Sequence, residues 1–272
     1  MPELPEVEVV RAGVEPVLVG RRIVGVRCAA QRLRHLSARE RFRRLAVGRV
    51  MVGVGRRAKY LLVRLDSGAV IVLHFGMTGR LRFADSGDPP LPHDHVCFEL
   101  DGEIELRFND ARRFGSIRIH AAGESMPELD GLGPEPLSRR FSATTLLASA
   151  RARSQPVKNL LMDGRVVAGV GNIYANEALF AAGVNPYKPA RDLTEGEAGT
   201  IVRCLRRILR QAIAAGGSSI SDFLGSDGKA GYFQLAFQAY GRHGQSCQRC
   251  GGVIRREVQA GRATFFCPRC QR

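Results

Sequence analysis

Four cysteines near the C-terminus constrain the fold of this chain most strongly. They follow the spacing Cys247-x2-Cys250-x16-Cys267-x2-Cys270. Each pair can present two thiolates from a tight turn, and two such turns complete a tetrahedral zinc site. Between the pairs, residues 253–258 and 263–266 alternate in polarity like the strands of a β-hairpin. The spacing therefore predicts a zinc ribbon with one structural Zn²⁺, because four sulfur ligands leave no coordination position open.

The chain carries a large positive charge. Its 41 Lys and Arg residues outnumber 26 Asp and Glu residues, which gives a formal net charge of +15. Such a charge attracts polyanions and releases their counterions on binding, as nucleic-acid-binding proteins do. A general arginine bias is the alternative, since only Lys59, Lys158, Lys188 and Lys229 are lysines. Candidate phosphate-binding stretches are residues 56–59, 112–113, 151–153 and Lys158.

The remaining composition indicates a cytoplasmic protein. The start Met-Pro-Glu-Leu-Pro-Glu lacks the basic and apolar regions of a secretory signal. No run of apolar residues approaches the roughly 18 that a membrane span needs. Cys28, Cys97 and Cys204 lie in apolar contexts, so we expect reduced core residues there.

Residue periodicity divides the chain into three predicted domains. Val7, Val10, Val14 and Val17 recur at helical spacing and predict one helix that ends at Gly20, and alternating segments from about 22 to 120 predict a β-sandwich or barrel. The clearest hairpins are 60–65 with 69–75, and 95–100 with 103–108. After a linker at 131–136, we expect three helices. Pro156 opens the first and Asn172 caps the second, while a Thr194/Glu197 capping box starts a long third helix that ends at Gly216-Gly217. We expect a β-sandwich domain at 1–130, a helical domain with a long loop at 131–235, and a zinc finger at 236–272.

The N-terminus offers a nucleophile. Removal of Met1 would expose the secondary amine of Pro2, and an α-amine titrates near pH 8, so much of it is uncharged at physiological pH. Attack on a sugar C1′ would give an iminium ion, and Glu3 could donate protons if it is buried. Taken locally, Met-Pro-Glu is more typical of a simple helix start.

Taken together, these features resemble the bacterial formamidopyrimidine-DNA glycosylase family along essentially the whole chain. Its N-terminal Pro-Glu-Leu-Pro-Glu-Val-Glu stands at residues 2–8. Further matching motifs are 57–60, 74–79, 109–115, 169–177, 226–233, the Tyr-Gly-Arg at Tyr240, and 261–267. The resemblance implies a β-sandwich with an N-terminal helix, a helix–two-turn–helix domain and a four-cysteine finger. It also implies excision of 8-oxoguanine and formamidopyrimidines from duplex DNA, with strand cleavage by β,δ-elimination at the abasic site.

The same resemblance implies residue roles. Pro2 would be the nucleophile, Glu3 the proton donor, Glu6 its electrostatic support, Lys59 an aid to β-elimination and Arg262 to δ-elimination. The implied DNA contacts are His74, Met77, His93, Arg112, Phe114, Arg153, Lys158, Asn172 and Tyr240. Among these, Met77, Arg112 and Phe114 would form a wedge that fills the gap left by the flipped base.

Two positions depart from the family pattern. Ala111 stands where the family usually has proline, which predicts a less rigid Arg112, and Arg153 replaces a common lysine. Two alternatives remain. An endonuclease VIII-type enzyme for oxidised pyrimidines is disfavoured by Leu4, and a non-catalytic zinc-ribbon DNA-binding protein is disfavoured by the intact catalytic set. We expect a monomer that uses no small-molecule cofactor.

Overall fold

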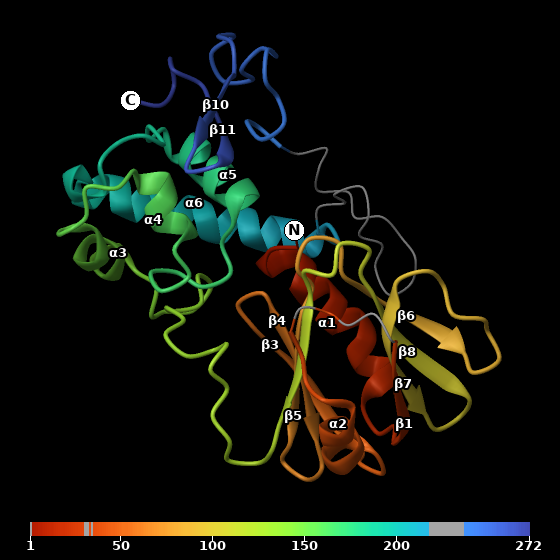
Figure 1. Ribbon diagram of the computed structural model, residues 1–272. Helices are drawn as coiled ribbons and strands as arrows, with labels where there is room; N and C mark the ends of the chain where they lie inside the picture. The colour runs from red at the N-terminus through yellow and green to blue at the C-terminus, as the bar shows by residue number, and fades with distance from the viewer. Residues whose placement is uncertain (1, 30–32, 34, 218–236) are drawn as a thin grey trace. The chain divides into compact units, whose positions relative to one another are not determined.

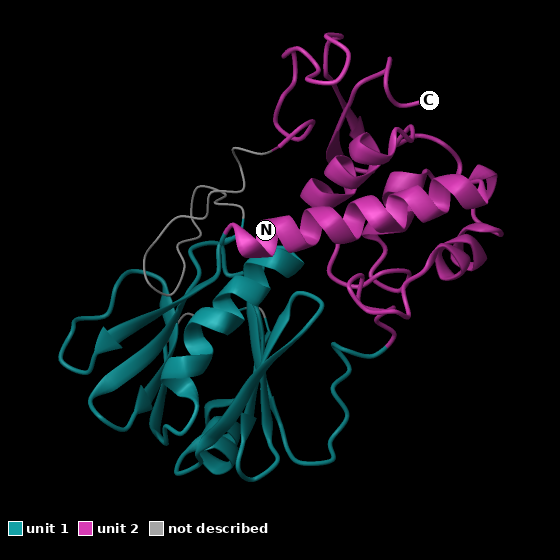
Figure 2. Ribbon diagram, turned by 180° about the vertical axis from the view of Figure 1, so that it is seen from behind, with its two compact units in different colours: residues 1–130, 216–232 teal, residues 131–215, 233–272 magenta. Residues whose placement is uncertain are grey.

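The computed structural model describes residues 2–29, 33, 35–217 and 237–272 (Figure 1). The chain forms two compact units (Figure 2). The first contains residues 1–130 and 216–232, and the second contains 131–215 and 233–272. The division into three domains stays a prediction. No helix in the described ranges is long and apolar enough to cross a lipid bilayer.

The first unit begins with the predicted helix, α1 (Leu4–Leu18). Glu3 is its N-cap residue, and Pro5 lies in its first turn, where a missing N–H costs nothing. Val7, Val10 and Val14 are buried, as their spacing predicts, and Leu18 rather than Val17 completes the buried face. Gly20 follows with φ +90°, a left-handed conformation that glycine adopts at little cost.

Two sheets form a β-sandwich with α1. The four-stranded sheet has the order β1 (Ile23–Cys28), β7 (Asp94–Leu100), β8 (Ile104–Asn109), β6 (Arg80–Asp85). The five-stranded sheet has the order β2 (His35–Leu36), β9 (Ser116–His120), β5 (Val70–His74), β4 (Tyr60–Leu65), β3 (Met51–Arg57). Figure 1 shows the sheets facing each other, and apolar side chains from both join α1 in one core. The two predicted hairpins, β4–β5 and β7–β8, are confirmed.

One helix of this unit was not predicted. Helix α2 (Arg39–Ala46) interrupts the region that alternation assigned to strands. Arginines make up half of its eight residues, so only Phe42 and Ala46, four positions apart, face the core. An apolar stripe this narrow gives the sequence little helical periodicity.

The second unit is helical and carries a two-stranded sheet. Its helices are α3 (Ala143–Ala150), α4 (Val157–Met162), α5 (Asn172–Ala182), the 3-10 helix η1 (Ala190–Asp192) and α6 (Glu195–Ala214). The sheet pairs β10 (Arg255–Gln259) with β11 (Arg262–Phe266) in antiparallel register.

The predicted caps of these helices are partly confirmed. The Thr194/Glu197 capping box starts α6, because the Glu197 N–H donates to Thr194 Oγ1 (3.2 Å) and the Thr194 N–H donates to Glu197 Oε2 (2.9 Å). The predicted cap of α5 is wrong by one residue. Gly171 is the N-cap, and Asn172 is the first helical residue, so its side chain is available for another contact.

Candidate functional site

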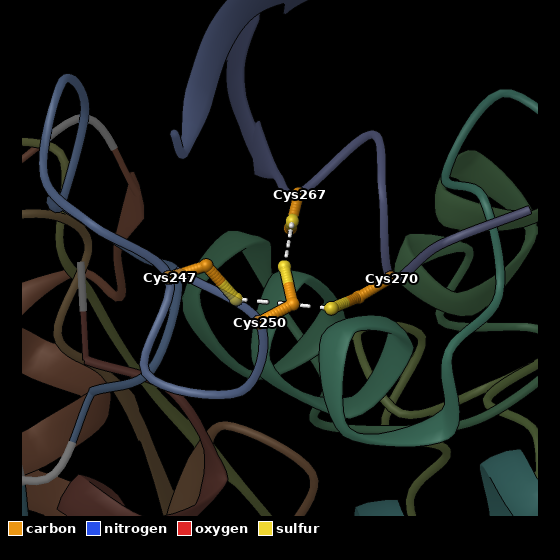
Figure 3. A group of neighbouring side chains, drawn as sticks. All are labelled: Cys247, Cys250, Cys267 and Cys270. Carbon is orange, nitrogen blue, oxygen red and sulfur yellow. Dashed lines mark hydrogen bonds between the residues drawn. The ribbon is translucent and has the colours of Figure 1, made fainter. Parts of the chain in front are cut away.

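The four cysteines come together at the end of the β10–β11 hairpin (Figure 3). Their sulfurs all lie within 4.8 Å of one another. Cys247 Sγ is 3.8 Å from Cys270 Sγ, and Cys250 Sγ is 3.6 Å from Cys267 Sγ. Four sulfurs at this spacing fit one tetrahedral Zn²⁺ and leave no position for substrate. The zinc is therefore structural, as predicted.

Polar side chains of α4 and α5 hold strand β11. Asn172 Nδ2 donates to the Ala263 carbonyl (2.9 Å), and Asn176 Oδ1 accepts from the Phe265 N–H (2.8 Å). Lys158 Nζ donates to the same Ala263 carbonyl (2.9 Å) and to Thr264 Oγ1 (2.8 Å). The backbone of the finger is thus anchored immediately after Arg262, which is exposed at the start of β11.

The environment of Lys158 differs from the one expected of a phosphate-binding residue. Its side chain is completely buried, at 0% exposure, and its ammonium group points at the finger. A buried ammonium must be satisfied by hydrogen bonds or counter-charges, which the finger supplies here in part. Arg153 is half-buried beside Asp163, with Nη1 3.5 Å from Oδ2. The DNA contacts expected of Lys158, Asn172 and Arg153 stay predictions.

Glu177 holds the chain segment that enters the finger. Its buried carboxylate accepts hydrogen bonds from the backbone N–H groups of Gln238 (2.9 Å), Ala239 (2.9 Å) and Tyr240 (2.7 Å). Burial raises the pKa of Glu177, although the three N–H donors act in the opposite direction. The Tyr240 ring then packs edge-to-face on Phe265, 5.0 Å between centroids. Sequence reasoning placed Glu177 in a motif but gave it no role.

At the N-terminus of α1, the predicted catalytic residues are brought together. Pro2, Glu3 and Glu6 are all buried, with Glu3 at 2% and Glu6 at 1% exposure. The Glu3 N–H donates to Glu6 Oε2 (2.8 Å), as part of a capping box. Gly217 lies against the same carboxylate, since a Cβ there would be 3.6 Å from Glu6 Oε1. The predicted loop beyond it, 218–235, lies outside the described residues.

Lys59 lies in a turn beside the end of β5, where His74 is the last residue. Arg57 pairs with Tyr60, so Lys59 lies in the tight turn between β3 and β4. His74 pairs with Tyr60 across β4 and β5, and their rings are 4.8 Å apart. Burial, with the nearby charge of Lys59, lowers the pKa of His74 to about 4. Because Nδ1 accepts from the Gly76 N–H (3.1 Å), the neutral ring carries its proton on Nε2.

The predicted wedge residues occupy two adjacent loops of the first unit, 75–79 and 110–115. Met77 and Phe114 are exposed by 43% and 46%, which is unusual for large apolar side chains. The Arg112 guanidinium lies 4.9 Å from the centre of the Phe114 ring, a cation–π contact. Gly76 presses on the second loop, because a Cβ there would be 2.4 Å from the Phe114 carbonyl carbon. His93 is also exposed, with φ +71°.

Comparisons with known proteins agree along the whole chain. Residues 1–117 match the model of the formamidopyrimidine-DNA glycosylase N-terminal domain, 132–224 that of its H2TH domain, and 244–272 a zinc finger found in FPG and IleRS. The formamidopyrimidine-DNA glycosylase of Laribacter hongkongensis is 50% identical, and that of Alteromonas mediterranea 45% identical, each over 100% of both chains.

Solved structures give the same result. The crystal structure of the MutM (FPG) protein from Thermus thermophilus is similar with a TM-score of 0.90 and 42% identity, over 99% of this chain and 98% of that one. A Lactococcus lactis FPG mutant in complex with Fapy-dG-containing DNA is similar with a TM-score of 0.93 and 32% identity, over 100% of both chains. A structure of MutM with DNA containing carbocyclic 8-oxo-G has a TM-score of 0.92 and 33% identity over 100% of both chains.

Proposed function

Because the chain belongs to the formamidopyrimidine-DNA glycosylase family, we propose that the buried cluster at the start of α1 carries its chemistry. The protein is a DNA glycosylase that excises oxidised purines from duplex DNA and cleaves the strand at the resulting abasic site. What remains to be assigned is the work of individual residues. The observation that carries the assignment is the burial of Pro2, Glu3 and Glu6 around one helix N-terminus.

Pro2 is the nucleophile. Its secondary amine attacks C1′ of the damaged nucleotide, the C1′–N9 bond breaks, and the base leaves with a proton. Opening of the sugar ring gives an iminium ion at C1′, which acts as the electron sink for β-elimination. Loss of a C2′ proton then expels the 3′-phosphate, and a second elimination, assisted by Arg262, expels the 5′-phosphate.

Glu3 and Glu6 divide the supporting roles. Glu3 donates protons to the leaving base and the opening ring oxygen, since it is adjacent to Pro2 and shielded from water. Glu6 holds the Glu3 backbone through the 2.8 Å hydrogen bond, and its negative charge stabilises the developing iminium.

The DNA backbone is bound by charged and neutral donors together. Lys59 contacts a phosphate as a cation and assists β-elimination, while His74 offers the N–H of its neutral Nε2 to a phosphate oxygen. Met77, Arg112 and Phe114 enter the duplex where the damaged nucleotide is extruded, and recover part of the lost stacking. His93, Arg153, Lys158, Asn172 and Tyr240 complete the proposed DNA-contacting set.

The zinc site fits a structural role in this scheme. Cys247, Cys250, Cys267 and Cys270 hold the metal, which fixes the hairpin that carries Arg262. We also propose that the protein is a monomer located in the cytoplasm. Its net charge of +15 favours association with nucleoid DNA there.

An N-terminal extension tests the nucleophile. If residues precede Pro2, its nitrogen becomes an amide whose lone pair is delocalised and cannot attack C1′. The extended protein should bind lesion DNA but neither excise 8-oxoguanine nor form a covalent complex on borohydride reduction. The matched control carries the same extension at the C-terminus and should do both. Normal excision by a protein that mass spectrometry shows to retain its N-terminal extension would remove Pro2 from the mechanism.

A further inference from the structure

Asp110 lies at the base of both wedge loops. It directly follows β8, and its side chain is completely buried, at 0% exposure. Carboxylate Oδ1 accepts a hydrogen bond from the Thr78 hydroxyl and from the Arg112 N–H (3.2 Å). Carboxylate Oδ2 accepts from the Gly115 N–H (2.7 Å). One side chain therefore ties loop 75–79 to both ends of the segment that presents Arg112 and Phe114.

The backbone of Asp110 fixes this side chain in turn. Its N–H donates to the His93 carbonyl (3.0 Å), and its carbonyl accepts from His95 Nε2 (2.8 Å) and from the Arg113 N–H (3.2 Å). His95 is buried, so this anchor is part of the sandwich and not of the loop. Asp110 thus links the sheet to the exposed wedge loops.

Close packing confirms that the two loops form one structure. A Cβ at Gly115 would lie 2.7 Å from Phe108 Cζ and 3.0 Å from Asp110 Oδ2. A Cβ at Gly76 would overlap the Phe114 carbonyl. The Gly76 backbone therefore packs directly against the Phe114–Gly115 backbone, with no space between the two loops at this point.

We infer that Asp110 is a positioning residue for lesion recognition, which holds the two loops in the geometry that lets Phe114 and Met77 enter the duplex. The inference rests on the proposed wedge role of these side chains. It also explains how Ala111 is accommodated. Without a proline ring to restrict the backbone at 111, the hydrogen bonds of Asp110 and Thr78 to the Arg112 N–H restrict it instead.

The chemistry of the site requires a carboxylate. Three donors converge on two oxygens, and an ionised carboxylate is an acceptor at both. In Asp110→Asn one of the two oxygens becomes an NH₂ group, which faces either the Gly115 N–H or the Arg112 N–H with the Thr78 hydroxyl. Either the buried Gly115 N–H then loses its acceptor, or the Arg112 N–H keeps only Thr78 Oγ1 of its two acceptors, and the loops gain alternative conformations.

The test compares base excision with cleavage at an abasic site. An abasic nucleotide has no base to unstack, so it depends less on the wedge. Asp110→Asn should lower single-turnover excision of 8-oxoguanine about tenfold, which corresponds to about 1.4 kcal/mol, and leave abasic-site cleavage within about threefold. A 2-aminopurine beside the lesion should show a correspondingly smaller fluorescence rise on binding, because less unstacking occurs.

Two further variants make the test specific. Asp110→Asn combined with Phe114→Ala should lose clearly less than the product of the two single losses, since both act on one wedge. Thr78→Val should reproduce part of the defect, whereas Thr78→Ser, which keeps the hydroxyl, should excise 8-oxoguanine as the wild type does. Glu105→Gln is the matched control. Glu105 is a buried carboxylate in β8, the strand that Asp110 follows, and it pairs with Arg27 and Arg107, so its substitution should lower stability and leave the ratio of the two activities unchanged.

The outcomes separate this inference from the proposed function. If Phe114→Ala shows selective loss of base excision but Asp110→Asn and Thr78→Val do not, the positioning role is wrong and the wedge stands. If the double variant loses the product of the two single losses, Asp110 acts independently of Phe114 and the inference is again wrong. If Phe114→Ala itself lowers both activities equally, the wedge role and the inference both fail.

Discussion

The neutral His74 makes a measurable prediction about stability in mild acid. An unperturbed histidine titrates near pH 6.5, whereas burial and the charge of Lys59 lower the pKa of His74 to about 4 in the folded protein. The unfolded chain therefore takes up this proton at a higher pH than the folded chain does. The free energy of unfolding is therefore unaffected by this group above about pH 6.5 and decreases progressively as the pH falls toward 4.

The size of the loss follows from the two pKa values. At pH 5 nearly all unfolded chains carry the proton on His74 and about one folded chain in ten does, so folding is weakened by about 2 kcal/mol relative to pH 7.5. The comparison protein is His74→Gln, whose amide oxygen can still accept from the Gly76 N–H. It keeps every other titratable group, so subtraction isolates His74.

Urea unfolding of both proteins at pH 7.5 and pH 5.0, followed by circular dichroism, measures this difference. The free energy of unfolding of the wild type should fall by about 2 kcal/mol more than that of His74→Gln. Proton NMR of the His74 ring should show a midpoint near pH 4 over the same range. Equal losses in the two proteins, or a midpoint near 6.5, would refute the conclusion that this ring is held neutral.

Two predictions concern the finger. Cys250→Ser should lose zinc, measured by atomic absorption, and most DNA affinity while the first unit stays folded, because so small a hairpin lacks a core of its own; full activity of a zinc-free preparation would contradict this. Asn176→Ala leaves the Phe265 N–H without its 2.8 Å partner and should cost about 1–3 kcal/mol of unfolding free energy. Asn159→Ala, whose Oδ1 has no hydrogen-bond partner within the described ranges, should cost less, and equal costs would count against the anchor.

Local signals in the sequence predicted much of this fold. The cysteine spacing, the two hairpins and the Thr194/Glu197 capping box each depend on residues close together in the chain, and each is confirmed. Helix α2 was missed for the opposite reason, since its burial comes from two residues that pack on distant strands. Such tertiary packing leaves little trace in a short window of sequence.

The candidate site also has a part that the sequence predicted and a part that it did not. Residue types and motifs singled out Pro2, Glu3 and Phe114, and the structure buries the first two and exposes the third. The environment of Lys158 could not be foreseen, because its partners Ala263 and Thr264 lie more than 100 positions away. The contacts of Asp110 and Glu177 could not be predicted either. Both carboxylates accept hydrogen bonds from backbone N–H groups, which every residue except proline has, so the residue types of the partners give no signal.

The anchoring of β11 on α4 and α5 decides where this protein can be recombined. A boundary at residue 236 would seem natural for exchanging the finger between relatives, yet it would separate Ala263 and Phe265 from Asn172, Asn176 and Lys158. A transplanted finger would then arrive with unmatched donors and acceptors, although its own zinc site was intact. A chimera that exchanges residues 131–215 together with 233–272 would keep the helices and the finger from one parent and leave residues 216–232 with the first unit, so a library built on those junctions should retain far more folded members.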